Sequence, residues 1–188
     1  NLAGGGIASG RMTVALVAAG VVAKQIVSEA RFDCRVVQIG SECDPARFDD
    51  IIAAAERDGD SVGGVIECRV EGVSPLRGEP FFDSVESVIS HLLFSIPAVK
   101  GVEFGDGFAG VVKRGSQRND KIFDVDGRTL SNNEGGINGG ITNGNPLVVR
   151  VAIKPTASIA REQLTYNLAC GDMQPLQMGG SHDASIAP

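Results

Sequence analysis

Several residue types that specialised proteins need are scarce in this sequence. Its 188 residues include no tryptophan and one tyrosine, so the core must be largely aliphatic. Two histidines, His91 and His182, stand far apart without clustered cysteines, which makes a zinc site a poor interpretation. The net charge is −6, and this shortage of positive charge argues against general binding of nucleic acid or of an anionic membrane. The longest apolar run, Val14 to Ala23, has about half the length of a membrane-spanning helix.

The four cysteines form no C-x-x-C pair, which argues against the usual redox and zinc motifs. They are Cys34, Cys43, Cys68 and Cys170, and three of them lie in or beside apolar runs. We expect reduced, packed thiols rather than disulfides, although the sequence leaves both open. Reduced thiols favour a cytoplasmic protein.

Hydrophobic residues make up 43% of the chain, which is enough for the core of a single domain over residues 1–188. Their spacing predicts helices over residues 11–30, 46–57 and 85–96. The first of these is apolar on nearly every face and is expected to be buried. Asp83 with Glu86 resembles a capping box for the third.

Strands are expected over residues 34–39, 66–71, 99–104, 108–113 and 147–153. The strands over 99–104 and 108–113 flank Gly105-Asp106-Gly107, which reads as the turn of a hairpin. The order of these elements predicts an α+β or a layered α/β fold.

Two short motifs match ligand-binding patterns only in part. Gly105 to Gly110 reads G-x-G-x-x-G, but no helix is predicted directly after it, as a dinucleotide site requires. Asp124 to Gly127 resembles the start of a calcium loop, but its glycine falls at the fourth position and not at the sixth. We therefore expect neither a nucleotide site nor a metal site there.

Two other segments carry better chemistry. In IKPTASI, residues 153–159, Lys154 and the following hydroxyls stand at a strand end, where they can hold a phosphate. A solvated proline turn is the alternative. In SNNEGGINGGITNG, residues 131–144, the glycines let the backbone approach a ligand closely, and a flexible surface loop is the alternative.

Long stretches of the chain resemble chorismate synthases. The similarity includes GGGIASGRMT, GDSVGGVIECRVEGV, SIPAVKGVEFGDGF, RGSQRND, the block from Asn132 to Ile159, and GSHDASIAP. The resemblance implies a layered β-α-β sandwich within the α+β class, assembled as a homotetramer. It also implies the conversion of 5-enolpyruvylshikimate 3-phosphate to chorismate with reduced FMN as cofactor, by elimination of phosphate without net redox change. The partners it implies are this small phosphorylated substrate, and neither nucleic acid nor a membrane.

The resemblance also assigns roles to single positions. Asp183 matches the aspartate that the family uses beside flavin N5, and is the expected catalytic residue. The glycine loop is expected to lie against the flavin. The expected flavin contacts are Ser9 within Ile7-Ala8-Ser9, Ala98, Gly139, Lys154, Pro155, Thr156, Ala157, Ser158 and Ser181.

Some positions depart from the family pattern. Ile7-Ala8 replaces Arg-Ser, Ser181 replaces Arg, and Glu134 stands where alanine is usual, placing a negative charge near an anionic cofactor. The family's two catalytic histidines lie in an N-terminal segment outside these residues, so we expect the core of a longer enzyme, inactive as a separate piece. Two alternatives stay open: a non-catalytic homologue that keeps the fold, and a generic anion-binding α+β module.

Overall fold

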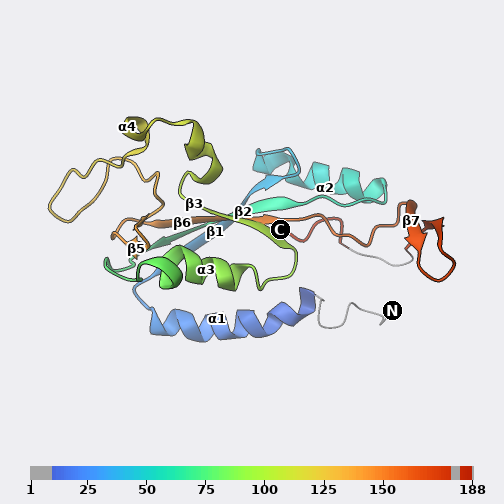
Figure 1. The fold of residues 1–188 in the computed structure, drawn as a ribbon, viewed down its shortest axis with the longest axis horizontal. Helices are drawn as coiled ribbons and strands as arrows, with labels where there is room; N and C mark the ends of the chain where they lie inside the picture. The colour runs from blue at the N-terminus through green and yellow to red at the C-terminus, as the bar shows by residue number, and fades with distance from the viewer. Residues whose placement is uncertain (1–9, 179–182, 188) are drawn as a thin grey trace. The chain divides into compact units, whose positions relative to one another are not determined.

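The structure is a computed structural model that describes residues 10–178 and 183–187. The chain forms two compact units, each made of two separate stretches. Figure 1 shows the helices and strands of the described residues, coloured along the chain. Unit 1 falls within residues 1–35 and 67–151, and unit 2 within residues 36–66 and 152–188. We describe each unit by itself, and the single domain expected over residues 1–188 stays a prediction.

Four α-helices are present in the described part of the chain. They are α1 (Val14–Ile26), α2 (Phe48–Arg57), α3 (Val85–Leu93) and the short α4 (Gly115–Arg118). Four 3-10 turns occupy Gly10–Thr13, Pro45–Arg47, Phe81–Asp83 and Gly107–Val112. The three predicted helices are thus confirmed, each shorter than expected.

Eight strands form one larger sheet and two hairpins in the described residues. The sheet has the order β1-β2-β6-β3, and β4 pairs with β5 and β7 with β8, both antiparallel. The strands are β1 (Arg31–Ile39), β2 (Gly64–Glu71), β3 (Val99–Phe104), β4 (Ile137–Asn138), β5 (Ile141–Thr142), β6 (Leu147–Ile153), β7 (Gln163–Asn167) and β8 (Asp172–Leu176). This mixture of helices and antiparallel sheets confirms the α+β class.

The core of unit 1 lies where α3 covers the sheet. Val70, Ile137 and Leu147 are buried, and Val85 of α3 packs against them. Every second residue of β6 is buried at its start, as alternation predicts for a strand with one face in the core. The core of unit 2 lies under α2, where Phe48, Ile51 and Ile52 pack against Ile39. This is the apolar helix face that the sequence predicts.

Helix α1 contradicts its prediction, because it is not buried. None of its residues is buried, and Val14, Val17 and Ile26 are 71%, 67% and 80% exposed. An apolar helix is buried only if something covers it, and among the described residues nothing covers α1 on most of its faces. The apolar sequence of α1 therefore predicts a helix that needs to be covered, but it does not show which part of the protein or of a partner covers it.

Two local predictions around residues 81–113 are wrong. Residues 108–113 form no strand: a 3-10 turn occupies Gly107–Val112, held by a hydrogen bond of 3.0 Å from Phe108 N to Glu103 Oε2. The N-cap of α3 is Ser84, whose hydroxyl accepts a hydrogen bond from Ser87 N, and not a capping box of Asp83 and Glu86. In both cases the local structure depends on which neighbouring side chain accepts a backbone hydrogen bond, and residue spacing does not show this.

The expectation of reduced thiols is wrong for two of the four cysteines. Cys34 of β1 and Cys68 of β2 form a disulfide, with their Cα atoms 4.1 Å apart. Arg35 follows Cys34 and Glu67 precedes Cys68, and these two side chains form an ion pair between the same two strands. β1 and β2 therefore run in opposite directions here. Strand pairing brings these cysteines together, and spacing along the chain does not reveal it. Cys43 and Cys170 are free and exposed.

Candidate functional site

The turn that follows β6 in unit 2 presents an unpaired cation. Lys154 is exposed, and its ammonium group has no hydrogen-bond or ion-pair partner among the described residues. Thr156 and Ser158, two and four residues further on, are half-buried, while Pro155 and Ala157 are exposed. An ammonium group without a described partner is suited to an anion such as a phosphate. The role expected of residues 154–158 stays a prediction.

This turn contacts the segment that carries the expected catalytic residue. Thr156 Oγ1 donates a hydrogen bond of 3.2 Å to the carbonyl oxygen of Asp183, 27 residues away in sequence. The side chain of Asp183 is exposed, and its carboxylate has no described partner. An unpaired carboxylate can accept a proton. The structure therefore brings Asp183 next to the Lys154 turn.

A third segment of unit 2, residues 61–63, contacts both of the others. Ser61 Oγ donates a hydrogen bond of 2.7 Å to Thr156 O, and Val62 N donates one of 2.8 Å to Ala184 O. The sequence analysis did not select these residues. The signal was present in the run Gly-Asp-Ser-Val-Gly-Gly, which combines a hydroxyl with glycines that permit close approach.

The glycine loop of unit 1 is held at its start by Asp120. The Asp120 carboxylate accepts hydrogen bonds from Ser131 Oγ at 2.6 Å, Asn133 N at 2.8 Å and Glu134 N at 2.9 Å. Burial alone would raise the pKa of Asp120, but these hydrogen bonds outweigh burial and lower it. The loop is therefore anchored, which excludes the flexible surface loop for its first half.

The tip of the loop is open. Gly139 has φ +59°, and no described atom lies within 4 Å of the position that a Cβ would take. Gly140 O accepts a hydrogen bond of 2.9 Å from Val85 N, so the tip lies at the N-terminal end of α3. Its open side is compatible with a ligand, as the prediction requires.

Ala98, the other expected contact in unit 1, lies beyond the opposite end of α3. It directly precedes β3, is half-buried and has φ +70°, a strained conformation for a residue other than glycine. A helix of nine residues is about 13 Å long, so Ala98 and Gly139 are not direct neighbours. Ser9, with Ile7 and Ala8, and Ser181 lie outside the described residues.

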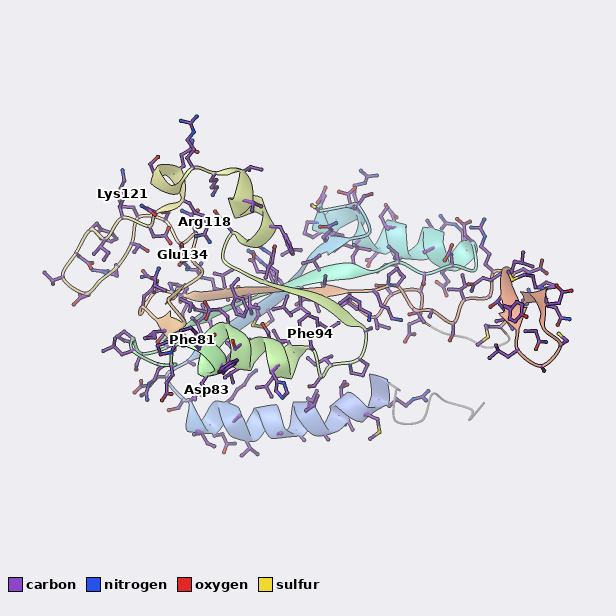
Figure 2. The ribbon with its side chains drawn as sticks, in the orientation of Figure 1. Phe81, Asp83, Phe94, Arg118, Lys121 and Glu134 are labelled. Atoms are coloured by element: carbon purple, nitrogen blue, oxygen red, sulfur yellow. A yellow bond between two sulfur atoms is a disulfide. The ribbon has the colours of Figure 1, made fainter. Side chains whose placement is uncertain are left out.

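Glu134 has a partner that the sequence analysis missed. Its carboxylate pairs with the Arg118 guanidinium, and Figure 2 shows the two side chains near each other at the start of the glycine loop. The side chain of Arg118 is 31% exposed and that of Glu134 is 30% exposed. The negative charge that looked unfavourable for an anionic cofactor is therefore compensated within the protein.

A second charged network lies on the sheet of unit 1. Arg150 donates to Glu67 at 2.9 Å and to Glu103 at 3.0 Å, and Arg35 donates to Glu67 at 3.0 Å. Burial alone would raise the pKa of Glu67, but the hydrogen bonds from Arg35 and Arg150 lower it overall. Burial likewise opposes the charge on Arg150, and its two carboxylate partners raise its pKa. These shifts favour the charged forms of Glu67 and Arg150, and the network joins side chains of β1, β2, β6 and β3.

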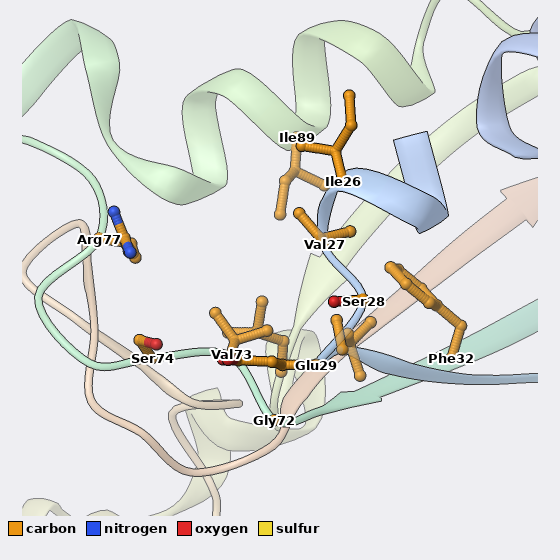
Figure 3. Close-up of a pocket in the computed structure, with 13 residues that line it drawn as sticks. Ile26, Val27, Ser28, Glu29, Phe32, Gly72, Val73, Ser74, Arg77 and Ile89 are labelled. Carbon is orange, nitrogen blue, oxygen red and sulfur yellow. The ribbon is translucent and has the colours of Figure 1, made fainter. Parts of the chain in front are cut away.

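A cavity of about 670 Å³ also lies in unit 1 (Figure 3). Its lining is mostly apolar and includes Ile26 and Val27 at the end of α1, Phe32, and Ile89 of α3, with Arg77 at one side. None of the expected site residues lines it. The Lys154 turn of unit 2, whose ammonium group has no described partner, is therefore the stronger candidate site.

Taken together, the described residues define an α+β protein in which an exposed lysine turn lies beside a carboxylate without a described partner. A family model described as chorismate synthase matches residues 1–188, and the chain belongs to the chorismate synthase family. This confirms the resemblance noted in the sequence.

Individual relatives agree with this assignment. A chorismate synthase of Chitinophaga pinensis is 49% identical over 185 residues, which cover 98% of this chain and 55% of the relative. A chorismate synthase of Synechococcus sp. (strain WH7803) is 41% identical over 215 residues, which cover 98% of this chain and 59% of the relative. A crystal structure of chorismate synthase superimposes with a TM-score of 0.73 at 33% identity, over 79% of this chain and 57% of the other. The chain thus spans less than two thirds of the length of these relatives.

Proposed function

We propose that this protein catalyses the reaction of its family, the elimination of phosphate from 5-enolpyruvylshikimate 3-phosphate to give chorismate, with reduced FMN as cofactor. The observation that carries the proposal is the hydrogen bond in unit 2 that joins the Lys154 turn to Asp183, where the ammonium group and the carboxylate both have no described partner. The family assignment gives this convergence its meaning.

The described residues fit an anionic flavin. Lys154 offers a cation without a described partner, and Thr156 and Ser158 offer hydroxyls beside it. Gly139 offers open backbone where a side chain would take up space. The ion pair between Arg118 and Glu134 removes the one negative charge that argued against this fit.

The chain's own groups have distinct tasks in this proposal. Reduced flavin supplies an electron-rich ring system that stabilises the reacting substrate electrostatically. Lys154 neutralises phosphate charge, and the Ser158 hydroxyl, which has no described partner, orients the anion, while the Thr156 hydroxyl is occupied by Asp183 O. Asp183 accepts a proton, since its carboxylate has no described partner. We assign cofactor contact to Ser9, Pro155, Ala157, Ala98 and Ser181 by family resemblance alone.

The assembly is a further part of the proposal. We propose a homotetramer, supported by the exposed apolar residues of α1, which need a covering surface. No helix in the described part of the chain is long and apolar enough to cross a membrane. A cytoplasmic location stays a prediction, and the disulfide between Cys34 and Cys68 removes the support that reduced thiols gave it.

Titration of the protein with reduced FMN without oxygen tests the proposal against its alternatives. Saturable binding together with chorismate formation supports it. Binding of flavin without turnover favours a non-catalytic homologue. Binding of inorganic phosphate without flavin favours the generic anion-binding module, which the match to the family over residues 1–188 already disfavours.

A further inference from the structure

Residues 59–63 run beside the Lys154 turn and touch it at three points. Gly59 O accepts a hydrogen bond of 3.0 Å from Arg161 N at one end of the contact. Ser61 Oγ donates its bond of 2.7 Å to Thr156 O in the middle. At the other end Gly63 lies against the residues where β6 turns into Pro155. The turn is therefore supported along its length by one neighbouring segment.

The glycine at position 63 is needed for this fit. A Cβ there would overlap the carbonyl oxygen of Ile153 and would lie 3.1 Å from Pro155 N. Both are backbone atoms, which cannot move aside as a flexible side chain can. Any larger residue at position 63 would displace the start of the turn.

The same segment also holds the irregular stretch that carries Asp183. Val62 N donates to Ala184 O at 2.8 Å, directly after Ser61 binds the turn. Thr156, whose carbonyl accepts from Ser61, in turn donates through its own hydroxyl to Asp183 O. Ser61, Thr156 and residues 183–184 thus form a closed set of three hydrogen bonds that links the turn to the carboxylate.

We infer that Ser61 is a positioning residue, which keeps the Lys154 turn and Asp183 in a fixed mutual arrangement. The three hydrogen bonds alone support the link between the segments. The effect of this link on flavin binding rests on the proposed function. Ser61 touches neither substrate nor cofactor in this account. Its hydroxyl acts through the Thr156 carbonyl, and Gly63 acts by allowing the two segments to approach.

The test compares Ser61→Ala with Ser61→Thr, which keeps the hydroxyl, and with Ser95→Ala. The last removes a serine hydroxyl bond of similar length, 2.6 Å to Leu92 O, from unit 1. Amide hydrogen exchange is measured on the whole protein for peptides that cover residues 60–64 and 154–160. The affinity for reduced FMN and the free energy of unfolding are measured on the same samples.

We expect Ser61→Ala to speed exchange in both segments about tenfold and to weaken FMN binding about tenfold, since it leaves a carbonyl without its partner. Ser61→Thr and Ser95→Ala should leave both values near wild type, and Gly63→Ala should act in the same direction as Ser61→Ala. Faster exchange in these segments together with unchanged exchange elsewhere separates local positioning from a general loss of stability.

The remaining outcomes each decide a different claim. Unchanged exchange in Ser61→Ala would overturn the inference, whatever the flavin does. Faster exchange with unchanged FMN affinity and unchanged turnover would also overturn the positioning role, and leave only a structural bond. A wild-type protein that binds no reduced FMN would refute the proposed function, and the exchange data would then still judge the link between the segments.

Discussion

At the scale of single residues, Lys154 is the group on which binding depends most directly. Its ammonium group has no described partner, so a bound anion would meet an available charge. Lys154→Ala should remove a charge-assisted contact of about 1.5–3 kcal/mol and weaken reduced-FMN binding about ten- to hundredfold. Titration of the flavin under anaerobic conditions measures this.

Lys121→Ala is the matched control, because Lys121 is an exposed lysine in the other unit whose side chain also has no described partner (Figure 2). It should bind flavin like the wild type. Equal affinity in wild type and Lys154→Ala would show that Lys154 is only a solvated turn residue.

Glu67 makes stability depend on pH. Its pKa is lowered from the usual 4.5, because Arg35 and Arg150 favour its charged form despite burial. The stabilisation is therefore complete above the ordinary pKa and is lost as pH falls through the lowered value. We expect the free energy of unfolding to decline as the pH falls below 4.5, and urea titrations at several pH values measure this decline.

Glu67→Gln should cost about 1.5–3 kcal/mol at neutral pH and flatten this decline. Glu71→Gln is the control on the same strand, since Glu71 pairs with Arg69 at an exposed position where ion pairs contribute little. An equally steep acid decline in Glu67→Gln and wild type would contradict this account of the network.

At the scale of elements, the hydrophobic pattern predicted those features that depend on the sequence of a single helix or strand. The apolar face of α2 and the alternation of β6 follow from periodicity, and the structure confirms both. The turn at residues 108–113 and the cap of α3 do not, because each depends on which neighbouring side chain supplies a hydrogen bond. The hairpin of β7 and β8 was missed, since all but one of its strand residues are exposed and no buried face marks them.

The candidate site divides in the same way. Lys154 and the glycine loop are visible in sequence as a cation at a strand end and as a run of glycines. The link from Thr156 to Asp183, and the role of Ser61 in it, join segments that are 27 and 95 residues apart. Local chemistry does not reveal such contacts without the fold.

The pairing of β1 with β2 gives a direct test at this scale. Trypsin cuts after arginine, so Cys34 falls in the peptide Phe32–Arg35 and Cys68 in the peptide Asp58–Arg69. Digestion without reductant should yield these two peptides as one disulfide-linked species by mass spectrometry. Two separate peptides with alkylated thiols would show that the pair is reduced in the protein.

At the scale of the whole molecule, the exposed apolar helix α1 predicts assembly. A monomeric protein rarely leaves so many aliphatic side chains in water along one helix. Sedimentation velocity at micromolar concentration should show an oligomer, with a tetramer expected for this family. A monomer at that concentration would contradict the prediction.

The length of the relatives bears on activity. The resemblance implies that the family's two catalytic histidines lie outside residues 1–188, and the chain spans 55% of the relative from Chitinophaga pinensis. A polypeptide made of residues 1–188 alone should therefore form no chorismate, even with excess reduced FMN. Turnover by that polypeptide would mean that the essential acid groups lie within these residues.

The central claim is that this protein eliminates phosphate from its substrate with the help of reduced flavin. The most direct measurement uses the whole natural protein, as distinct from residues 1–188 alone, and follows chorismate by its absorbance after 5-enolpyruvylshikimate 3-phosphate is added without oxygen and with reduced FMN. The account predicts chorismate and phosphate in equal amounts, no net oxidation of the flavin, and no product when FMN is left out. Chorismate formed equally well without flavin, or no chorismate from a protein that binds both compounds, would contradict it.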